Sequence, residues 1–271
     1  TMNLPSGKTL IQATNDAADI NKDYNIDLPI VGGAKLVLRQ MIDACREIVG
    51  NSRRDDQSTA KEVHSEREGW LGQWRAKLSS AEVPMTPYRV IWDFMHTIPP
   101  EDAIVTHDSG SPRDQIVAFY RSNGPRTYLG WGKSHGLGTG LGLTIGAKLA
   151  APEKVCVNFM GDAAFGMVGL DFETAVRSNI PIITVVLNNY TMAVETRQMA
   201  DSHGLYRTRD LGGNYADLGK AMGGYAERIE DPSQISAAFT RARKVTEEEG
   251  KAVLLEFITS EETELSHRRA F

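Results

Sequence analysis

The sequence is poor in the residues that several protein classes require. It has 30 Lys and Arg against 35 Asp and Glu, and a net charge of −5 does not supply the basic surface of a general nucleic-acid-binding protein. Two cysteines, Cys45 and Cys156, are too few for a disulfide framework, and Cys156 lies in an apolar run typical of a core strand. No apolar run reaches the roughly 20 residues of a membrane-spanning helix, and the first residues lack the basic and apolar regions of a signal peptide. These absences predict a cytoplasmic protein with no nucleic-acid or membrane partner.

What the sequence does contain is typical of a globular α/β protein. Hydrophobic residues make up 41% and charged residues 24% of the 271 residues, which suffices for one full core and a smaller piece. Over residues 85–260, short apolar runs alternate with helix-like patterns. This alternation predicts a doubly wound parallel sheet with helices on both faces.

The segments before and after residues 85–260 do not form a second complete domain. Residues 1–48 show one strand and one helix, too little to bury a core, and are predicted to be the C-terminal part of another α/β domain. Residues 49–84 are predicted to be a linker and a helix, whose tryptophans, four residues apart, indicate packing. Residues 261–271 are predicted to be a polar tail, with the acidic run SEETE exposed to solvent.

The stretch from Gly161 to Asn189 carries the most functional information. An apolar run, KVCVNFM, precedes the loop GDAAFG, a helix follows, and a second apolar run, PIITVVL, ends at the Asn pair. Parallel strands joined by such a crossover lie side by side or one strand apart, so their carboxyl ends come within roughly 5–10 Å. Open parallel sheets bind ligands at these ends.

The side chains at the two strand ends are hard oxygen ligands. Asp162 follows the first predicted strand and Asn189 the second, and a backbone carbonyl such as that of Thr191 completes a set that suits Mg²⁺ with phosphate oxygens. Gly161, Ala163 and the next small residue, Ala164, leave room for phosphates near the helix start. The alternative is structural: the aspartate caps a helix and the asparagine pair forms a turn.

This stretch resembles the thiamine diphosphate signature of the acetolactate synthase superfamily, GDG followed at a set distance by NN. Here GDA is separated from NN by the 24 residues 164–187, which matches the family's spacing. Ala163 replaces the third glycine of the signature. That change matters only if the backbone there needs a positive φ angle.

The resemblance extends over nearly the whole chain. HDSGSPRD resembles the family's diphosphate-contacting loop, and GLGTGLGLTIGA resembles the segment whose large apolar residue supports the bent coenzyme. GDAAFG followed by GLDFETAVR is similar to the subgroup of 2-hydroxyacyl-CoA lyases and oxalyl-CoA decarboxylases, and residues 8–38 resemble the end of the family's central domain. Besides the loop after the first strand, the resemblance implies these cofactor-binding residues: Ser109, Gly110, Ser111, Gly136, Leu137 and Met192.

The resemblance implies an enzyme that binds thiamine diphosphate and Mg²⁺. Its activity would be that of a C–C lyase, decarboxylase or carboligase on a small 2-oxo or 2-hydroxyacyl substrate, with acyl-CoA compounds among the candidates. The family's activating glutamate belongs to a separate pyrimidine-binding domain, which this chain lacks, and Glu173 is expected on an exposed helix face. We therefore expect either a second polypeptide, in a dimer or tetramer of pairs, or cleavage from a longer precursor.

Two other function classes remain open at this level. One is a non-catalytic assembly or regulatory subunit that keeps the same fold, and the other is a generic magnesium-binding α/β module. The motifs of the diphosphate loop and the Leu137 segment favour the enzyme.

Several histidines and arginines are weaker candidates. His107 and His135 lie in loops expected to face the coenzyme, where they could transfer protons or contact the diphosphate, or be solvated loop residues. The aperiodic segment after the Asn pair could bind an anionic substrate, with surface side chains as the alternative. Its candidates are His203, Arg197, Arg207 and Arg209.

Overall fold

The structure, a computed structural model, describes residues 7–50, 57–130, 136–194 and 198–266. The chain divides into two compact units, Thr1–Arg67 and Glu68–Phe271. The division falls inside one long helix, α2 (Ser58–Leu78). It therefore precedes the boundary at residue 85 suggested by the sequence, because the last turns of α2 are buried in the core of the second unit.

The first unit is a small α/β piece. Strands β1 (Ile11–Thr14) and β2 (Leu28–Val31) pair in parallel, and the 3-10 helix η1 (Ala17–Asp19) and helix α1 (Ala34–Val49) complete it. The sequence analysis missed β2, since LPIV is short, contains a proline and is mostly exposed. Among the described residues of this unit only Val37 is buried. Its assignment to a larger central domain stays a prediction.

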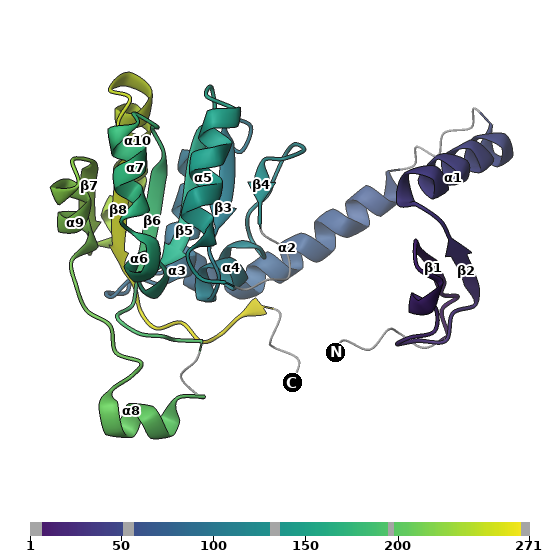
Figure 1. Cartoon of the computed structure of the whole chain (residues 1–271), viewed down its shortest axis with the longest axis horizontal. Helices are drawn as coiled ribbons and strands as arrows, with labels where there is room; N and C mark the ends of the chain where they lie inside the picture. The colour runs from purple at the N-terminus through teal and green to yellow at the C-terminus, as the bar shows by residue number, and fades with distance from the viewer. Residues whose placement is uncertain (1–6, 51–56, 131–135, 195–197, 267–271) are drawn as a thin grey trace. The chain divides into compact units, whose positions relative to one another are not determined.

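The second unit contains a six-stranded, wholly parallel sheet in the order β4-β3-β5-β6-β8-β7 (Figure 1). This confirms the predicted parallel α/β fold. The strands are β3 (Ala103–His107), β4 (Tyr128–Leu129), β5 (Val155–Gly161), β6 (Ile183–Asn188), β7 (Tyr225–Ile229) and β8 (Val253–Ile258).

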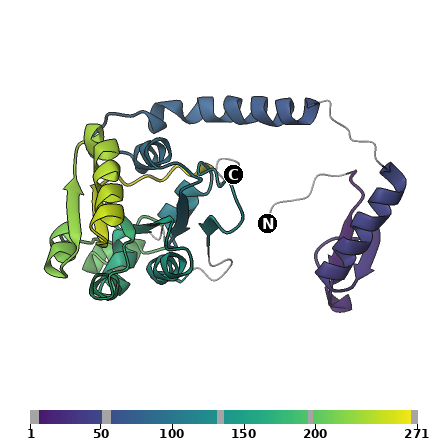
Figure 2. The same ribbon diagram turned by 90° about the horizontal axis from the view of Figure 1, so that it is seen from above.

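Helices cover both faces of this sheet (Figures 1 and 2). They are α3 (Pro87–Thr97), α4 (Ser111–Ile116), α5 (Thr139–Ala150), α6 (Asp162–Val168), α7 (Asp171–Arg177), α9 (Tyr215–Ala221) and α10 (Ile235–Glu248), with the 3-10 helix η2 (Pro232–Gln234). Helix α8 (Ala200–Tyr206) lies apart from the sheet and has no buried residue (Figure 1).

Strand alternation divides the core into two layers. In β5, Val157 and Phe159 face the layer formed with α2, α3 and α10, whereas Cys156 and Met160 face the layer formed with α5, α6, α7 and α9. A strand buried on both faces reads as one continuous apolar run, which is why this pattern was visible in the sequence. Burial raises the pKa of the Cys156 thiol to about 11, in keeping with an unreactive core cysteine.

The start of α3 has a capping sequence, Thr86-Pro87. Thr86 precedes the helix, its hydroxyl accepts a hydrogen bond from the amide of Arg89 at 3.1 Å, and Pro87 occupies the first position. The tryptophans of α2 also pack as expected. Trp74 is 1% exposed, and its ring contacts those of Tyr88 and Phe119.

Several elements differ from the sequence-based expectation. The single helix expected after Asp162 is two short helices, α6 and α7, with the glycine-containing junction at Gly169 between them. Helix α4 begins inside the HDSGSPRD segment that was interpreted as a loop, at Ser111, because Pro112 fits a first helical turn. Strand β4 and helix α8 lie in segments that showed no period in the sequence.

The segment after β8 is not a solvated tail as far as residue 266. Lys77 lies 2.6 Å from the carboxylate of Glu262 and 2.9 Å from that of Glu264, and the Tyr88 hydroxyl donates to the Glu264 carbonyl at 2.6 Å. Leu265 is buried. The expectation of a solvated acidic run is therefore only partly met: Glu261 and Thr263 are exposed, whereas Lys77 of α2 pairs with Glu262 and Glu264.

Within the described part of the chain, no helix is long and apolar enough to cross a membrane. The cytoplasmic location stays a prediction.

The aromatic cluster around Trp74 generates a test of the core. Replacing Trp74 by Ala removes a buried ring from contact with three others, those of Trp70, Tyr88 and Phe119, and we expect the free energy of unfolding to fall by about 3–5 kcal/mol. Urea unfolding followed by circular dichroism measures this. Leu149→Ala is the matched surface control, because Leu149 is 65% exposed on α5, and it should change stability by less than about 0.5 kcal/mol. Equal effects of the two substitutions would contradict the assignment of this core.

Candidate functional site

A cavity lies at the carboxyl ends of the central strands of the larger sheet. The chain leaves β3 toward β4 on one side and continues through β5 and β6 on the other, so the strand order reverses between β3 and β5. The cavity is lined by the loops that follow these strands and by the segment after β8. Its lining residues are Pro87, Ser109, Gly110, Ser111, Pro112, Gln115, Leu137, Gly161, Asp162, Ala163, Ala164, Leu187, Asn189, Thr191, Met192, Ala193, Val194, Thr259 and Ser260.

Asp162 provides a buried carboxylate with spare capacity to accept a ligand. The residue is 3% exposed, and its Oδ1 accepts a hydrogen bond from the amide of Ala163 at 2.8 Å. Its Oδ2 is buried with no hydrogen-bond partner among the described residues. Burial raises the pKa of Asp162 to about 6, against the opposing effect of the nearby amides of Ala163, Tyr190 and Asn189. A buried acceptor without a donor calls for a proton or a cation.

The loop after β6 brings two further oxygen ligands to the same cavity. Strands β5 and β6 are neighbours, with Gly161 opposite Leu187, so the residues that follow each strand meet at one edge. The Asn189 side-chain carbonyl accepts a hydrogen bond from the Thr191 amide at 3.1 Å, and its second lone pair stays available. The Thr191 hydroxyl is buried without a partner among the described residues, while the Thr191 carbonyl accepts from Ala193 at 2.9 Å.

These groups fit a small hard cation. One carboxylate, one amide oxygen and the oxygens of a threonine are the ligand types that Mg²⁺ accepts, with phosphate oxygens and water completing the shell. No cluster of three or more His, Cys, Asp or Glu side chains occurs in the described part of the chain, so a site built only from such residues is not present there. The candidate set therefore consists of the residues named from the sequence, Asp162, Asn189 and Thr191, which all line the cavity, and metal binding by them stays a prediction.

Asp108 is a buried residue that supports the loops around the cavity without lining it, and the sequence analysis did not single it out. It follows β3, is fully buried, and its Oδ1 accepts from the amides of Ser109 and Gly138, both at 2.8 Å. Its Oδ2 accepts from the amide of Gly140 at 2.9 Å. The carboxylate thus ties the glycine-rich start of α5 to the end of β3. The one signal in the sequence was an aspartate placed directly after a short apolar strand.

Most predicted cofactor-binding residues line the cavity. Ser109, Gly110 and Ser111 do so from the loop between β3 and α4, where Gly110 has a φ of 85° that favours glycine. Leu137 and Met192 also line the cavity, whereas the exposed Gly136 is not among its lining residues.

The change from GDG to GDA causes no strain. Ala163 lies in the first turn of α6, and it is absent from the described residues with a positive φ. Ala163 and Ala164 both line the cavity, so their small side chains face the space that a ligand would occupy.

His107 does not line the cavity. Its ring packs against Tyr128 of β4, with centroids 5.4 Å apart, and its Nδ1 lies 3.2 Å from the Asp108 carbonyl. Burial lowers the pKa of His107, so its neutral form is favoured in this position. A catalytic role for His107 stays a prediction, and His135 lies outside the described residues.

The remaining candidates lie in exposed ion pairs. Glu173 is on α7 and pairs with Arg177 at 3.1 Å, as expected for a residue on a helix face. Arg207 pairs with Asp210 at 2.6 Å and Arg209 with Glu261 at 3.2 Å. His203 does not line the cavity either, and Arg197 lies outside the described residues.

Comparisons with known proteins agree on the family. Residues 108–257 match the family model described as "Thiamine pyrophosphate enzyme, C-terminal TPP binding domain". The chain is 26% identical over 251 residues to a probable acetolactate synthase large subunit of Methanococcus aeolicus, covering 86% of this chain and 40% of the relative. It is 31% identical over 170 residues to the acetolactate synthase large subunit IlvG of Mycobacterium tuberculosis, covering 62% of this chain and 31% of the relative.

A solved structure shows the same fold. Benzoylformate decarboxylase from Polynucleobacter necessarius superposes with a TM-score of 0.68 at 18% identity, covering 97% of this chain and 46% of that one. The chain thus spans less than half the length of these relatives. The matched residues 108–257 include the strand ends and loops that bring Asp162 and Asn189 together.

The raised pKa of Asp162 generates a test without any ligand. The folded-state pKa of Asp162, about 6, exceeds the ordinary value of 3.8. The free energy of unfolding of the cation-free protein should therefore decrease as the pH rises from 3.8 to about 6 and Asp162 ionises. Asp162→Asn carries no charge, so in a chelating buffer at pH 7.5 we expect it to exceed the wild type by about 1–3 kcal/mol in free energy of unfolding. Near pH 4 the difference should vanish.

Urea unfolding at the two pH values measures this effect. Asp201→Asn, at an exposed position of α8, is the control and should match the wild type at both. An Asp162→Asn protein that is less stable than the wild type at pH 7.5 would contradict the assignment of a poorly satisfied carboxylate.

Proposed function

The chain belongs to the thiamine pyrophosphate enzymes, and we propose that it is the diphosphate- and magnesium-binding subunit or fragment of a C–C lyase, decarboxylase or carboligase. Thiamine pyrophosphate, also called thiamine diphosphate, would be its coenzyme, and a small 2-oxo or 2-hydroxyacyl compound its substrate. The acetolactate synthases and the benzoylformate decarboxylase to which the chain is similar support this substrate class.

The observation that carries the proposal is the pair of unsatisfied oxygens in the cavity. Asp162 Oδ2 and the Thr191 hydroxyl are buried without partners among the described residues, beside the Asn189 side chain. Leaving such atoms unpaired costs stability, which a bound cation would offset. A non-catalytic subunit with this fold would gain nothing from keeping two unpaired buried oxygens that lower its stability. These atoms therefore weigh against the assembly or regulatory alternative.

The residues around these oxygens suit the rest of the coenzyme. When bound, thiamine diphosphate supplies a nucleophilic thiazolium carbon and an electron sink. Asp162, Asn189 and Thr191 would hold Mg²⁺, and the glycine-containing loop 109–111 leaves its backbone accessible to a diphosphate. Leu137 would give the cavity an apolar wall.

A second polypeptide would complete the site. Among the described residues that line the cavity, Asp162 is the one carboxylate, and its role is to bind the cation. No glutamate there could activate the coenzyme's aminopyrimidine, and Glu173 points outward in an ion pair. We therefore place the activating glutamate on a partner chain or on a segment separated from this one. The likeness to the CoA-dependent subgroup stays a prediction.

Cofactor dependence tests the proposal directly. With the co-purifying partner, the chain should release CO₂ from 2-oxo acids or join two carbonyl compounds only when thiamine diphosphate and Mg²⁺ are both present. Replacing a residue that only supports a metal ligand typically lowers metal affinity or activity by about 10- to 100-fold. Loss of the ligand itself, in Asp162→Ala, should therefore lower kcat/KM by about 100-fold or more. Asp201→Ala is the matched control and should keep wild-type activity.

Two results would contradict the proposal. One is an Asp162→Ala complex with wild-type activity, which would point to a subunit whose fold is retained without its chemistry. The other is a wild-type chain that binds neither coenzyme nor Mg²⁺ with any partner.

A further inference from the structure

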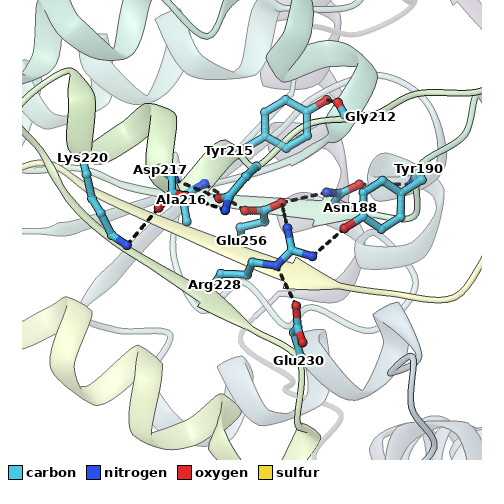
Figure 3. A network of polar contacts seen from close by, with 11 residues as sticks. Asn188, Tyr190, Gly212, Tyr215, Ala216, Asp217, Lys220, Arg228, Glu230 and Glu256 are labelled. Atoms are coloured by element: carbon cyan, nitrogen blue, oxygen red, sulfur yellow. Dashed lines mark hydrogen bonds and ion pairs between the residues drawn. The ribbon is translucent and has the colours of Figure 1, made fainter.

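A second buried carboxylate lies outside the cavity, in the middle of β8. Glu256 is fully buried and is not among the cavity-lining residues. Its Oε1 accepts a hydrogen bond from the Asn188 amide group at 2.7 Å and lies 3.5 Å from the Arg228 guanidinium. Its Oε2 accepts from the backbone amide of Ala216 at 2.8 Å. Figure 3 shows the carboxylate between these three donors. A buried charge in the core is retained at a cost, so a function for it is worth seeking.

Glu256 determines how the Asn188 side chain is oriented. A carboxylate only accepts hydrogen bonds, so the Asn188 NH₂ group must face Glu256 and its carbonyl must face the other way. That carbonyl accepts from the Tyr190 amide at 3.1 Å. Asn188 is fully buried at the end of β6, so it transmits the position of Glu256 to the backbone of the next loop.

Arg228 holds the same loop from a second side. Its guanidinium donates to the Tyr190 hydroxyl at 2.6 Å and to Glu230 at 2.7 Å, while it faces Glu256 (Figure 3). Tyr190 has a φ of 59°, a left-handed conformation that non-glycine residues adopt at some cost. Its backbone amide, its hydroxyl and its carbonyl are all hydrogen-bonded, the last from Leu211 at 2.9 Å.

The strained Tyr190 lies between the two candidate cation ligands of the loop. Asn189 precedes it and Thr191 follows it, and both line the cavity with Asp162. The amides of Asn189 and Tyr190 also lie close enough to Asp162 to affect its carboxylate. The geometry of all three ligands thus depends on how Tyr190 is held.

We infer that Glu256 is a positioning residue for the cation site. Through Asn188 and Arg228 it holds Tyr190 in the left-handed conformation that directs Asn189 and Thr191 toward Asp162. This inference rests on the proposed function for the identity of the ligand, and on the hydrogen-bond network for the mechanism. Groups that orient metal ligands typically influence affinity by about 10- to 100-fold without touching the metal.

A complementary swap tests the network. Glu256→Gln is nearly isosteric but places an amide donor against the Asn188 donor or the Ala216 amide. Asn188→Asp places a second carboxylate against Glu256. Each single change should weaken binding of Mn²⁺ to the full chain with thiamine diphosphate and its partner by about 10- to 100-fold, measured by electron paramagnetic resonance. The double variant restores one donor facing one acceptor at the same net charge, and should return the affinity to within about 3-fold of wild type.

Glu227→Gln is the matched control. Glu227 lies on the neighbouring strand β7 and accepts hydrogen bonds from Arg241 and Tyr225, away from the cavity. Its substitution by Gln removes the same charge as Glu256→Gln. Its Mn²⁺ affinity should equal that of the wild type. Glu256→Gln binding as tightly as the wild type, or a double variant no tighter than its parents, would overturn the inference.

Hydrogen exchange separates this inference from the proposed function. In metal-free protein, Glu256→Gln should speed amide exchange in the peptide that covers residues 188–192 but not in β3. If the wild type binds no Mn²⁺ yet this local effect is seen, the proposed function fails and the positioning mechanism holds. Unchanged exchange overturns the mechanism.

Tyr190→Phe decides the matter if Glu256→Gln does not fold. It removes only the hydroxyl that Arg228 binds. The loss of that hydrogen bond should weaken Mn²⁺ binding by roughly 3- to 10-fold, with thermal melting close to that of the wild type. An unchanged affinity would again overturn the inference.

Discussion

A carboxylate buried beside the end of a parallel strand needs donors, and the way three such carboxylates meet that need organises the larger unit. Asp108 accepts three backbone amides, and Glu256 accepts the Asn188 side chain and the Ala216 amide and faces Arg228. Asp162 accepts a hydrogen bond from the Ala163 amide, and its second oxygen is buried without a partner among the described residues. The carboxylates of Asp108 and Glu256 hold parts of the fold together, whereas that of Asp162 has an oxygen left over, to which we assign the proposed cation.

The register of the sheet makes this contrast possible. Gly161 of β5 lies opposite Leu187 of β6, and Asn188 lies opposite Ile258 of β8. The residues that follow these positions emerge at one edge, where their loops share a cavity. Glu256 lies on β8, the neighbour of β6, and accepts a hydrogen bond from Asn188 in the core. Its contacts therefore couple β8 to the loop that carries Asn189. The proposed cation site and the packing of the sheet are therefore linked through a few hydrogen bonds.

The features that were predictable from the sequence are those set by local pattern. The buried strand ending at Gly161 and the capped start of α3 at Thr86 carry periodic or capping signals, and both occur where these signals place them. Strand β2, the two-residue β4 and helix α8 lack such signals, because they are short and depend on tertiary contacts. The segment around Glu262 seemed solvated for the same reason: its partner, Lys77, lies far away in the sequence.

The features of the candidate site can be separated in the same way, into those predictable from the sequence and those that required the structure. By itself the sequence determined that Asp162 and Asn189 follow two buried strands of one parallel crossover unit, because apolar runs, crossover length and signature spacing are local properties of the chain. That these strands are direct neighbours came from the structure. Only the tertiary structure decided that Asp108 ties the start of α5 to β3, that His107 packs against β4, and that Glu256 accepts a hydrogen bond from Asn188. These contacts join residues that are distant in sequence, and their hydrogen-bond partners follow from the strand order and register, which no single segment contains.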